Sequence, residues 1–557
     1  MSPDDADGQS DHSLPSEDGA LGMESVSQIK TNARPECFRS TIHEVFFVLT
    51  ATMAIAMQAM LAGSVTVTSN FIGQDLGMTT AEITWLSSSS SLTSGAFLLF
   101  FGKIADLFGR KLLFVGSLFL FAVFSLVAGF MKSGISVDII CGVMGLMSAS
   151  GVPPAVGILG VIYEKPSKRK NYAFACFSAG NPMGFVFGTI FGGLATNLFG
   201  WRASFWLIAI IFGAFAVTGS FVIPADSTDK EPFNLETIKR MDLLGTVLII
   251  FGIGMFSAAL SLGDTAPQGW KTGYVLALLT TGASLMIAFV LWDCWYKHPL
   301  VPMGIWRDRN FTLCLCIMML GLAAFTPGNF FQSLFFQQVW HWSALNVAVH
   351  LLPMVIVGLG VNVIAGLILH RVSNKLLMAI GTLGYVVCFL LLTLQKESSS
   401  YWAFSFPALM LIVLGADLGF NVANMYVMSS MPRSQQSIAG SIFQTATKLC
   451  QTVGFGLATA VFNAVQQKSQ MSNYWEKVTQ PYAAVFITAL ALSLAGLLLV
   501  PFLTIGTQGG KAKPEEASNS TSGDVAELDV SDEKTAEAEA TIVQDAPGPV
   551  EVLPVKA

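Results

Sequence analysis

The chain has 557 residues, of which 53% are hydrophobic and only 12% are charged, and its mean hydropathy is +0.61. This composition excludes a soluble globular protein and gives no support for nucleic-acid binding; it is typical of an integral membrane protein. Acidic residues outnumber basic ones at both ends, by eight to three in residues 1–42 and by eleven to four in residues 511–557. We therefore expect a basic membrane body between two disordered acidic tails.

Fourteen apolar runs follow the first tail, and each approaches the ~20 residues that a membrane helix needs. They lie at about 45–69, 83–101, 112–131, 138–161, 172–196, 203–223, 242–263, 273–292, 311–338, 344–369, 376–395, 402–430, 437–465 and 482–506. Polar segments at 224–241 and 295–310 flank the seventh and eighth runs. The pattern predicts an all-α membrane protein with fourteen transmembrane helices.

The distribution of lysine and arginine predicts the orientation. With both tails in the cytoplasm, 24 of the 30 basic residues fall on the cytoplasmic side, counting Lys448 near the start of a helix. A basic run between the fourth and fifth spans, which includes Lys165 and Arg169, favours the same side. Since basic loops remain in the cytoplasm, we expect both termini there. No cleavable signal peptide follows Met1, so the first span should direct insertion.

The stretch GKIADLFGRK at 102–111 connects the second and third runs and is too polar for hydrocarbon. Its glycines permit a tight turn, and its charged groups can form charge-assisted contacts at one membrane face. The stretch resembles the signature loop of the major facilitator superfamily. The resemblance implies a cytoplasmic gate between two halves of the protein, formed by Gly102, Asp106, Gly109, Arg110 and Lys111.

The count of fourteen spans and the segment HPLVPMGIWRDRNF at 298–311 resemble the fourteen-span drug:proton antiporters, and among them the fungal aminotriazole-resistance-like exporters. This resemblance implies a monomer with two six-helix bundles and two inserted helices. The expected parts are a tail (1–42), an N-terminal bundle (43–223), a linker with the inserted helices (224–310), a C-terminal bundle (311–506) and an acidic tail (507–557).

Four glycines of the fifth run recur at i, i+4 spacing, beginning with Gly180. Such a stripe permits close approach of another helix. The run resembles the antiporter motif of the superfamily at Gly184, Gly188, Gly192 and Gly193, although Thr189 replaces its proline. A tightly packed structural helix is the alternative interpretation.

Asp417, in the twelfth run, is the one acidic residue that we place near the bilayer midplane. Asn421, Asn424 and Met428 follow it on the same helix face. Because a charge inside the membrane is costly, we interpret Asp417 as the proton-coupling residue; the alternative is a structural aspartate bonded to a neighbouring span. The resemblance places this helix along the central path. Acidic and basic residues that many relatives carry in the first and fourth spans are missing, with Cys141 at the basic position.

Amide side chains among aromatic residues predict a binding pocket for amphipathic molecules. Gln58 lies in the first run, and Asn329 and Gln332 lie in the ninth, among Phe325, Phe330, Phe331, Phe335 and Phe336. With Asn421 and Asn424 these amides are the candidate substrate-binding residues. Some of the phenylalanines should instead face lipid. We interpret His350, in the tenth run, as a structural residue, and Arg202 as an anchor on the external side.

These observations predict a secondary transporter that exports small organic compounds, such as drugs, toxins or secondary metabolites, by proton antiport and alternating access. An uncoupled facilitator or uptake carrier of the same fold remains the alternative. An enzyme is disfavoured because no metal-ligand or nucleophile motif is present, and a channel because no charged ring or filter loop is. We expect no cofactor and no metal. We expect the plasma membrane as location, with the vacuolar membrane as the alternative.

Overall fold

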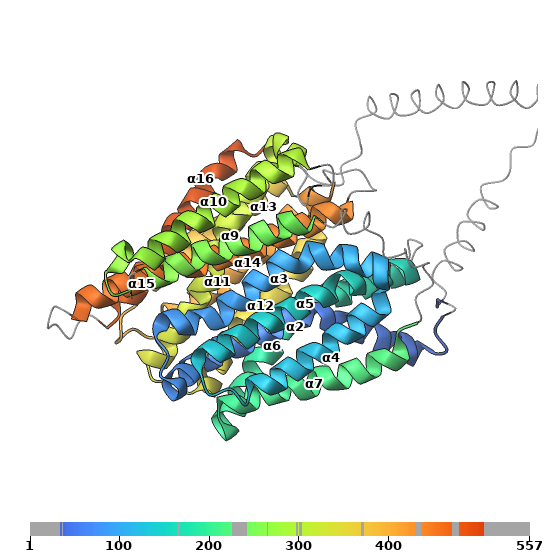
Figure 1. The fold of residues 1–557 in the computed structure, drawn as a ribbon, viewed down its shortest axis with the longest axis horizontal. Helices are drawn as coiled ribbons and strands as arrows, with labels where there is room; N and C mark the ends of the chain where they lie inside the picture. The colour runs from blue at the N-terminus through green and yellow to red at the C-terminus, as the bar shows by residue number, and fades with distance from the viewer. Residues whose placement is uncertain are drawn as a thin grey trace, which may run out of the picture. The chain divides into compact units, whose positions relative to one another are not determined.

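The computed structural model describes residues 34–35, 37–163, 168–224, 242–263, 266–296, 299, 303–368, 372–429, 436–470 and 478–505. Most of both predicted tails, the linker 225–241 and Lys165 lie outside these ranges. Within them, all regular structure is helical, as predicted, and Figure 1 shows the helices side by side.

Fourteen helices of at least 19 residues are described, which agrees with the fourteen predicted spans. They are α2 (Thr41–Leu76), α3 (Thr80–Phe108), α4 (Arg110–Ala128), α5 (Gly134–Ile162), α6 (Lys168–Phe199), α7 (Trp201–Val222), α9 (Leu243–Leu262), α10 (Gly273–Trp295), α11 (Arg309–Gln338), α12 (Ala344–Ile368), α13 (Asn374–Thr393), α14 (Ser405–Ser429), α15 (Gln436–Gln470) and α16 (Gln480–Leu499). Short 3-10 turns lie at Gly269–Lys271, Met303–Arg307 and Val500–Phe502. We call the side where α2 begins the tail side, and the opposite side the far side.

Capping residues define the first hairpin, between α2 and α3. Gly77 ends α2 with a φ of 65°, a left-handed conformation that glycine adopts without strain. Thr79 and Glu82 then form a capping box, in which the Thr79 amide donates to the Glu82 carboxylate at 2.7 Å. The chain therefore reverses within a few residues and sends α3 back beside α2.

Twelve of the fourteen helices are long and apolar enough to cross a membrane by themselves. The two that fall short are α3 and α15, and they pack against each other. Buried hydroxyl groups lie along α3, at Ser87, Ser88, Ser90, Ser91 and Ser94. Thr459 of α15 donates to Thr84 of α3 at 2.9 Å. These two helices are polar because they face other helices rather than lipid.

The inserted helices α9 and α10 pack on each other and beside the α3–α15 pair. Gly252 of α9 lies against Met286 of α10, and Gly254 lies against Leu92 of α3. Ser257 of α9 donates to the Thr452 carbonyl of α15 at 3.0 Å. Helix α9 therefore covers one side of the seam where α3 and α15 meet, and Figure 1 shows α9 and α10 running beside α15.

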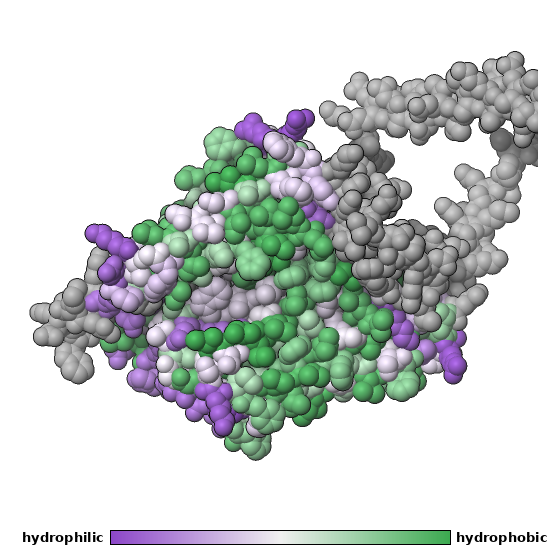
Figure 2. Space-filling model, viewed as in Figure 1, coloured by the Kyte–Doolittle hydropathy of each residue, from purple (hydrophilic) through white to green (hydrophobic). Residues whose placement is uncertain are grey.

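Apolar side chains cover much of the outside of the helical body, as the green surface in Figure 2 shows. Phe221 is 81% exposed and Leu498 is 71% exposed. Such exposure would be unfavourable in water, whereas hydrocarbon solvates it, and helices satisfy their own backbone hydrogen bonds there. This outer surface is the lipid-facing one, so the protein is a multi-pass membrane protein.

Candidate functional site

A cluster of one carboxyl group and two amides joins the middles of α12 and α14. Asn421 donates a hydrogen bond to the Asn362 side-chain oxygen at 2.9 Å, and Asn362 donates to the Gly358 carbonyl at 2.9 Å. The Asn362 side chain also lies beside the Asp417 carboxyl group. Asp417 is half-buried and is the thirteenth of the 25 residues of α14. A titratable group therefore lies halfway along a membrane helix.

Gly358 makes room for this cluster. A Cβ at this position would lie 3.0 Å from the Oδ2 atom of Asp417 and 2.9 Å from the Cγ1 atom of Val413. Any larger residue would displace the carboxyl group. Asn424 lies one turn beyond Asn421 and is half-buried, while the Met428 side chain lies outside the described part of the chain. The sequence-based interpretation missed Asn362, although a polar residue within the tenth apolar run was a signal for it.

The predicted amides do not converge on this cluster. Gln58 of α2 donates to the Ser90 hydroxyl of α3 at 3.2 Å, within the N-terminal bundle. Gln332 of α11 is fully buried and donates to Gln395 and Ser405, at the far-side ends of α13 and α14. The candidate substrate-binding residues thus lie in separate places, and Gln332 serves to join helices of the C-terminal bundle.

Asn329 and Gln58 each keep one amide oxygen that is buried without a hydrogen-bond partner among the described residues. The side-chain oxygen of Gln332 is likewise buried without a hydrogen-bond partner among these residues. A buried acceptor without a donor is unfavourable by roughly 1–3 kcal/mol. Each of these three oxygens is thus a buried acceptor without a donor among the described residues.

The phenylalanines of α11 pack into the interior instead of lining an open pocket, which corrects the sequence-based expectation. Phe330 packs edge-on against Phe455, and their ring centres are 5.5 Å apart. Phe331 lies 5.2 Å from Phe462, and Phe335 packs against Tyr482. The exposed fractions of Phe330, Phe331, Phe335 and Phe336 are at most 1%, so these rings face neither lipid nor open space. Long-range packing from α15 and α16, which the local sequence does not encode, occupies that side of α11.

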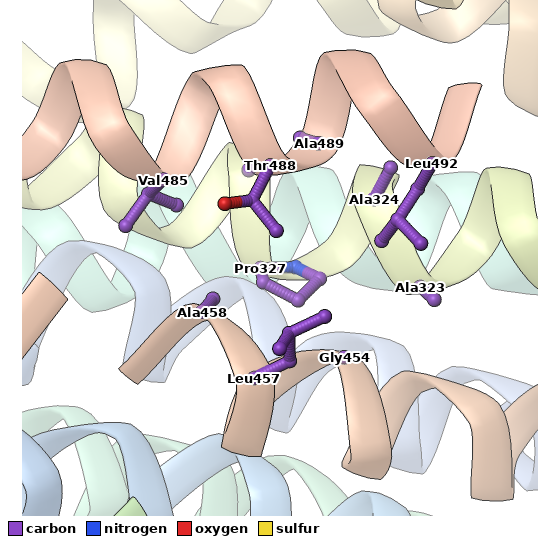
Figure 3. A pocket seen from close by; sticks show the side chains of 11 residues that line it. Ala323, Ala324, Pro327, Gly454, Leu457, Ala458, Val485, Thr488, Ala489 and Leu492 are labelled. Atoms are coloured by element: carbon purple, nitrogen blue, oxygen red, sulfur yellow. The ribbon is translucent and has the colours of Figure 1, made fainter. Parts of the chain in front are cut away.

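A small hollow lies among α11, α15 and α16, and Figure 3 shows its lining. Pro327 interrupts the backbone bonding of α11 there, and Leu457 and Leu492 close the sides. Thr488 supplies the one hydroxyl among otherwise apolar lining residues. The space holds about one water molecule, so this hollow is too small for an organic substrate.

The far-side ends of the two bundles are tied together between α2 and α11. Ser333 donates to the Thr66 carbonyl at 2.7 Å, and Gln337 donates to the same carbonyl at 3.1 Å. The Gln337 side-chain oxygen also accepts from the backbone N–H of Asn70. Gln338 donates to the side-chain oxygen of Asn70 at 2.9 Å. This network closes the seam between the bundles on the far side.

The predicted gate loop forms the sharp turn between α3 and α4. Gly109 has a φ of 104°, a conformation that side chains other than glycine rarely adopt. Arg110 donates to the Gly157 carbonyl of α5 at 3.1 Å, and Lys111 donates to the Ile223 carbonyl at 2.6 Å. The Asp106 side chain lies outside the described part of the chain, and Gly102 approaches Pro153 of α5. The described contacts of the loop fix it to the N-terminal bundle.

The glycine stripe of α6 lies directly against α2. A Cβ on Gly188 would lie 2.2 Å from the Met60 carbonyl oxygen, and one on Gly184 would lie 2.9 Å from the Ala56 carbonyl oxygen. Gly192 packs in the same way against Ser64. Gly193 points elsewhere, toward Ala344 of α12 in the other bundle. The motif therefore serves two contacts, one inside the N-terminal bundle and one across the seam.

Charged groups at the two ends of the N-terminal bundle act as ties. Glu44 accepts from the Tyr163 hydroxyl at 2.9 Å and pairs with Arg169 on the tail side. Burial, together with this hydrogen bond, raises the pKa of Tyr163 above its usual range. On the far side, Arg202 pairs with Asp75 at 2.6 Å.

His350 of α12 lies in an aromatic cluster at the far side. Its ring is 4.2 Å from the Trp342 ring, its Nδ1 contacts the Asn346 carbonyl oxygen at 2.8 Å, and its carbonyl accepts from the Tyr401 hydroxyl. Burial raises the pKa of Tyr401 to about 12, so this hydroxyl remains a donor at physiological pH. No group of three metal-ligating side chains exists within the described residues.

Comparison with known proteins shows the family of this chain. The chain is 26% identical to the efflux pump terJ of Aspergillus terreus, over 83% of this chain and 88% of that one. It is 29% identical to the low affinity ammonium transporter of Saccharomyces cerevisiae, over 77% and 82%. It is 23% identical to the aminotriazole resistance protein of the same yeast, over 84% and 86%. The profile of the Major Facilitator Superfamily matches residues 48–455. The chain belongs to this superfamily of membrane transporters, as the signature loop indicated.

Proposed function

We propose that this protein exports small organic compounds from the cytoplasm in exchange for protons. The carrying observation is the Asp417 carboxyl group, which lies midway along α14 beside Asn362 of α12. The similarity to an efflux pump favours export as the direction. The tail side would then face the cytoplasm, and the plasma membrane would be the location.

In this mechanism, protonation of Asp417 neutralises a carboxylate that is costly to keep inside the membrane. The protonated carboxyl group favours one arrangement of the bundles, and the compound favours the other. Release of the α2–α11 hydrogen bonds opens the far side, while the gate loop around Asp106 and Arg110 holds the tail side. The free acceptors of Gln58 and Asn329, with Asn421 and Asn424, contact the compound as it passes.

Purified full-length protein in proteoliposomes tests this proposal. A pH gradient is imposed, and flux of a dye panel (ethidium, rhodamine 123 and fluorescein) is followed together with internal pH. Coupled exchange requires that dye movement against its gradient consumes the pH gradient. Dye movement that only follows its own gradient would contradict proton coupling and leave a facilitator.

An uptake carrier is the second candidate, and one specific observation favours it. The chain is 29% identical to a protein described as a low affinity ammonium transporter. Methylammonium accumulation in the same proteoliposomes, driven by an inward gradient and independent of any dye, would favour this alternative.

A further inference from the structure

Lys448 of α15 lies deep in the membrane body, which corrects its sequence-based placement near the start of a helix. A Cβ on Gly95 would lie 2.6 Å from the Lys448 Cβ. Gly95 is the sixteenth of the 29 residues of α3, so this contact lies halfway through that helix. Lys448 is therefore at the seam where the N-terminal bundle meets the C-terminal bundle.

The Lys448 ammonium group has no ion pair or hydrogen bond within the part of the chain that the structure describes. The described ion pairs, Glu44 with Arg169 and Asp75 with Arg202, belong to the ends of the N-terminal bundle. The Asp417 carboxyl group lies beside Asn362 and forms no ion pair with Lys448 among the described residues. A lysine inside a membrane protein is costly unless an anion compensates it. The compensating anion is thus to be sought outside the described chain.

Lys448 is the centre of a polar stripe. Gln444, Lys448 and Gln451 are spaced i, i+4, i+7, so they share one face of α15, and all three are half-buried. The adjacent residues show which way this face points. Leu449 packs into the apolar cluster with α3 and α9, and Cys450 donates to the Met319 carbonyl of α11. Since a helix turns about 100° per residue, the stripe faces α3 and the space between the bundles.

The far-side end of this stripe is aromatic. Phe455 follows Gln451 by four residues on the same face, and it packs edge-on against Phe330 of α11. A cation, two amides and an aromatic ring therefore follow one another along one face of α15. Phe455 is only 1% exposed, so its ring closes the stripe and is not open to a bound compound. An organic anion suits the remaining part of the stripe, because its charged group matches the ammonium group of Lys448 and the neighbouring amides.

We propose that Lys448, with Gln444 and Gln451, binds the anionic group of the transported compound, so that the substrates are small organic anions. This inference rests on the proposed transport function and adds the substrate class to it. The anion pairs with the ammonium group when the compound enters the seam, and the glutamine amides donate to its remaining oxygens.

This assignment has an electrical consequence. Exchange of one proton inward for one monovalent anion outward moves two positive charges inward in each cycle. An inside-negative potential therefore accelerates export of an anion. Exchange of one proton for one monovalent cation moves no net charge, so potential leaves its rate unchanged.

The test uses two aromatic ions of similar size, neither of which titrates: p-toluenesulfonate and trimethylphenylammonium. Proteoliposomes that contain the full-length protein are loaded with one labelled ion. Efflux of this ion is measured at a fixed pH gradient, with and without a potassium–valinomycin potential. We expect saturable efflux of p-toluenesulfonate that rises with inside-negative potential. Efflux of trimethylphenylammonium without efflux of the sulfonate overturns this inference but leaves the transport proposal standing. Efflux of neither ion also overturns this inference, and the dye panel described above then decides the transport proposal.

Variants then test Lys448 directly. We expect Lys448→Gln to lower sulfonate efflux about ten-fold or more, the loss of one charge-assisted contact, and Lys448→Arg to retain most of it. Lys271→Gln, which changes an exposed lysine outside the membrane helices, should behave as the unchanged protein does. Size-exclusion profiles show whether each variant is folded, and Lys448→Met replaces Lys448→Gln if the latter aggregates. Equal sulfonate efflux by a folded neutral variant and the unchanged protein overturns the assignment to Lys448.

Discussion

Asn421 of α14 donates a hydrogen bond of 2.9 Å to Asn362 of α12, one helical turn from Asp417. The two residues are 59 positions apart in the chain, and their contact holds Asn362 beside the Asp417 carboxyl group. Because Asn362 lies beside Asp417 and bonds to Asn421, the proposed titration of Asp417 would act next to the α12–α14 contact.

Asp417→Asn should abolish export driven by a pH gradient while leaving exchange of substrate for substrate. The amide resembles the protonated carboxyl group in shape and hydrogen bonding but cannot titrate, so no proton is carried. Proteoliposomes with and without a pH gradient measure the two activities separately. Gradient-driven export at the unchanged rate by this variant would exclude Asp417 as the coupling residue.

Asn362→Ala should weaken coupling without removing it. The carboxyl group of Asp417 remains but loses its amide partner, so we expect fewer protons moved per substrate and an altered dependence of the transport rate on pH. The ratio of proton influx to substrate efflux measures this effect. An unchanged ratio together with an unchanged pH profile would show that Asn362 has only a packing role.

Gly188→Ala should destabilise the protein, because its methyl group would lie 2.2 Å from the Met60 carbonyl oxygen of α2. Overpacking of this kind costs about 1–3 kcal/mol and should lower the Tm in detergent. Gly116→Ala in α4 is the matched control, since nothing lies within 4 Å of a Cβ there. A Tm of the Gly188 variant equal to that of the Gly116 variant would contradict the close packing of α6 on α2.

The sequence predicts the helices and the position of the glycine stripe because both follow from local spacing. The length of an apolar run predicts a span whatever the helix packs against. It does not predict how far the helix continues into polar residues: the run at 45–69 is part of a helix from Thr41 to Leu76. The site depends on contacts between distant helices. Neither the approach of Gly95 to Lys448 nor the burial of Phe330 beneath Phe455 can be read from spacing along one helix. The sequence identifies amides such as Gln332 as polar residues within spans, but it does not identify their partners on other helices.

Arg110→Ala should reduce turnover about ten-fold or more while the protein still reaches the membrane. Arg110 donates to the Gly157 carbonyl, so its loss removes a hydrogen bond between the turn after Gly109 and α5. Substrate binding should be retained better than transport, because the loop lies at the tail-side end of the helices. Binding and initial rates are compared with those of Lys132→Ala, which alters an exposed lysine at the far side. Equal transport rates in the two variants would show that the loop only connects α3 to α4.

Both termini should lie in the cytoplasm. An even number of spans places the two ends on one side, and the excess of basic residues favours the cytoplasmic side. Epitope tags inserted after residue 5 and after residue 550 should bind antibody only after the cells are permeabilised. Labelling of either tag on intact cells would overturn this topology.

Cross-linking of α2 to α11 should stop transport by keeping the far side closed. Asn70 and Gln338 are joined by a hydrogen bond of 2.9 Å across the seam, so cysteines at these positions are within reach of a short bifunctional reagent. In a background without the eight native cysteines, Asn70→Cys with Gln338→Cys should be active until a bis-methanethiosulfonate joins the two thiols through disulfide bonds. Reduction of these disulfides should restore activity. Binding of substrate from the tail side should persist throughout, because that side remains free to open. The control pair, Asp75→Cys with Arg202→Cys, joins α2 to α7 within one bundle, and its cross-linking should leave transport intact. Full transport by the cross-linked Asn70–Gln338 pair would show that the bundles need not separate at this seam.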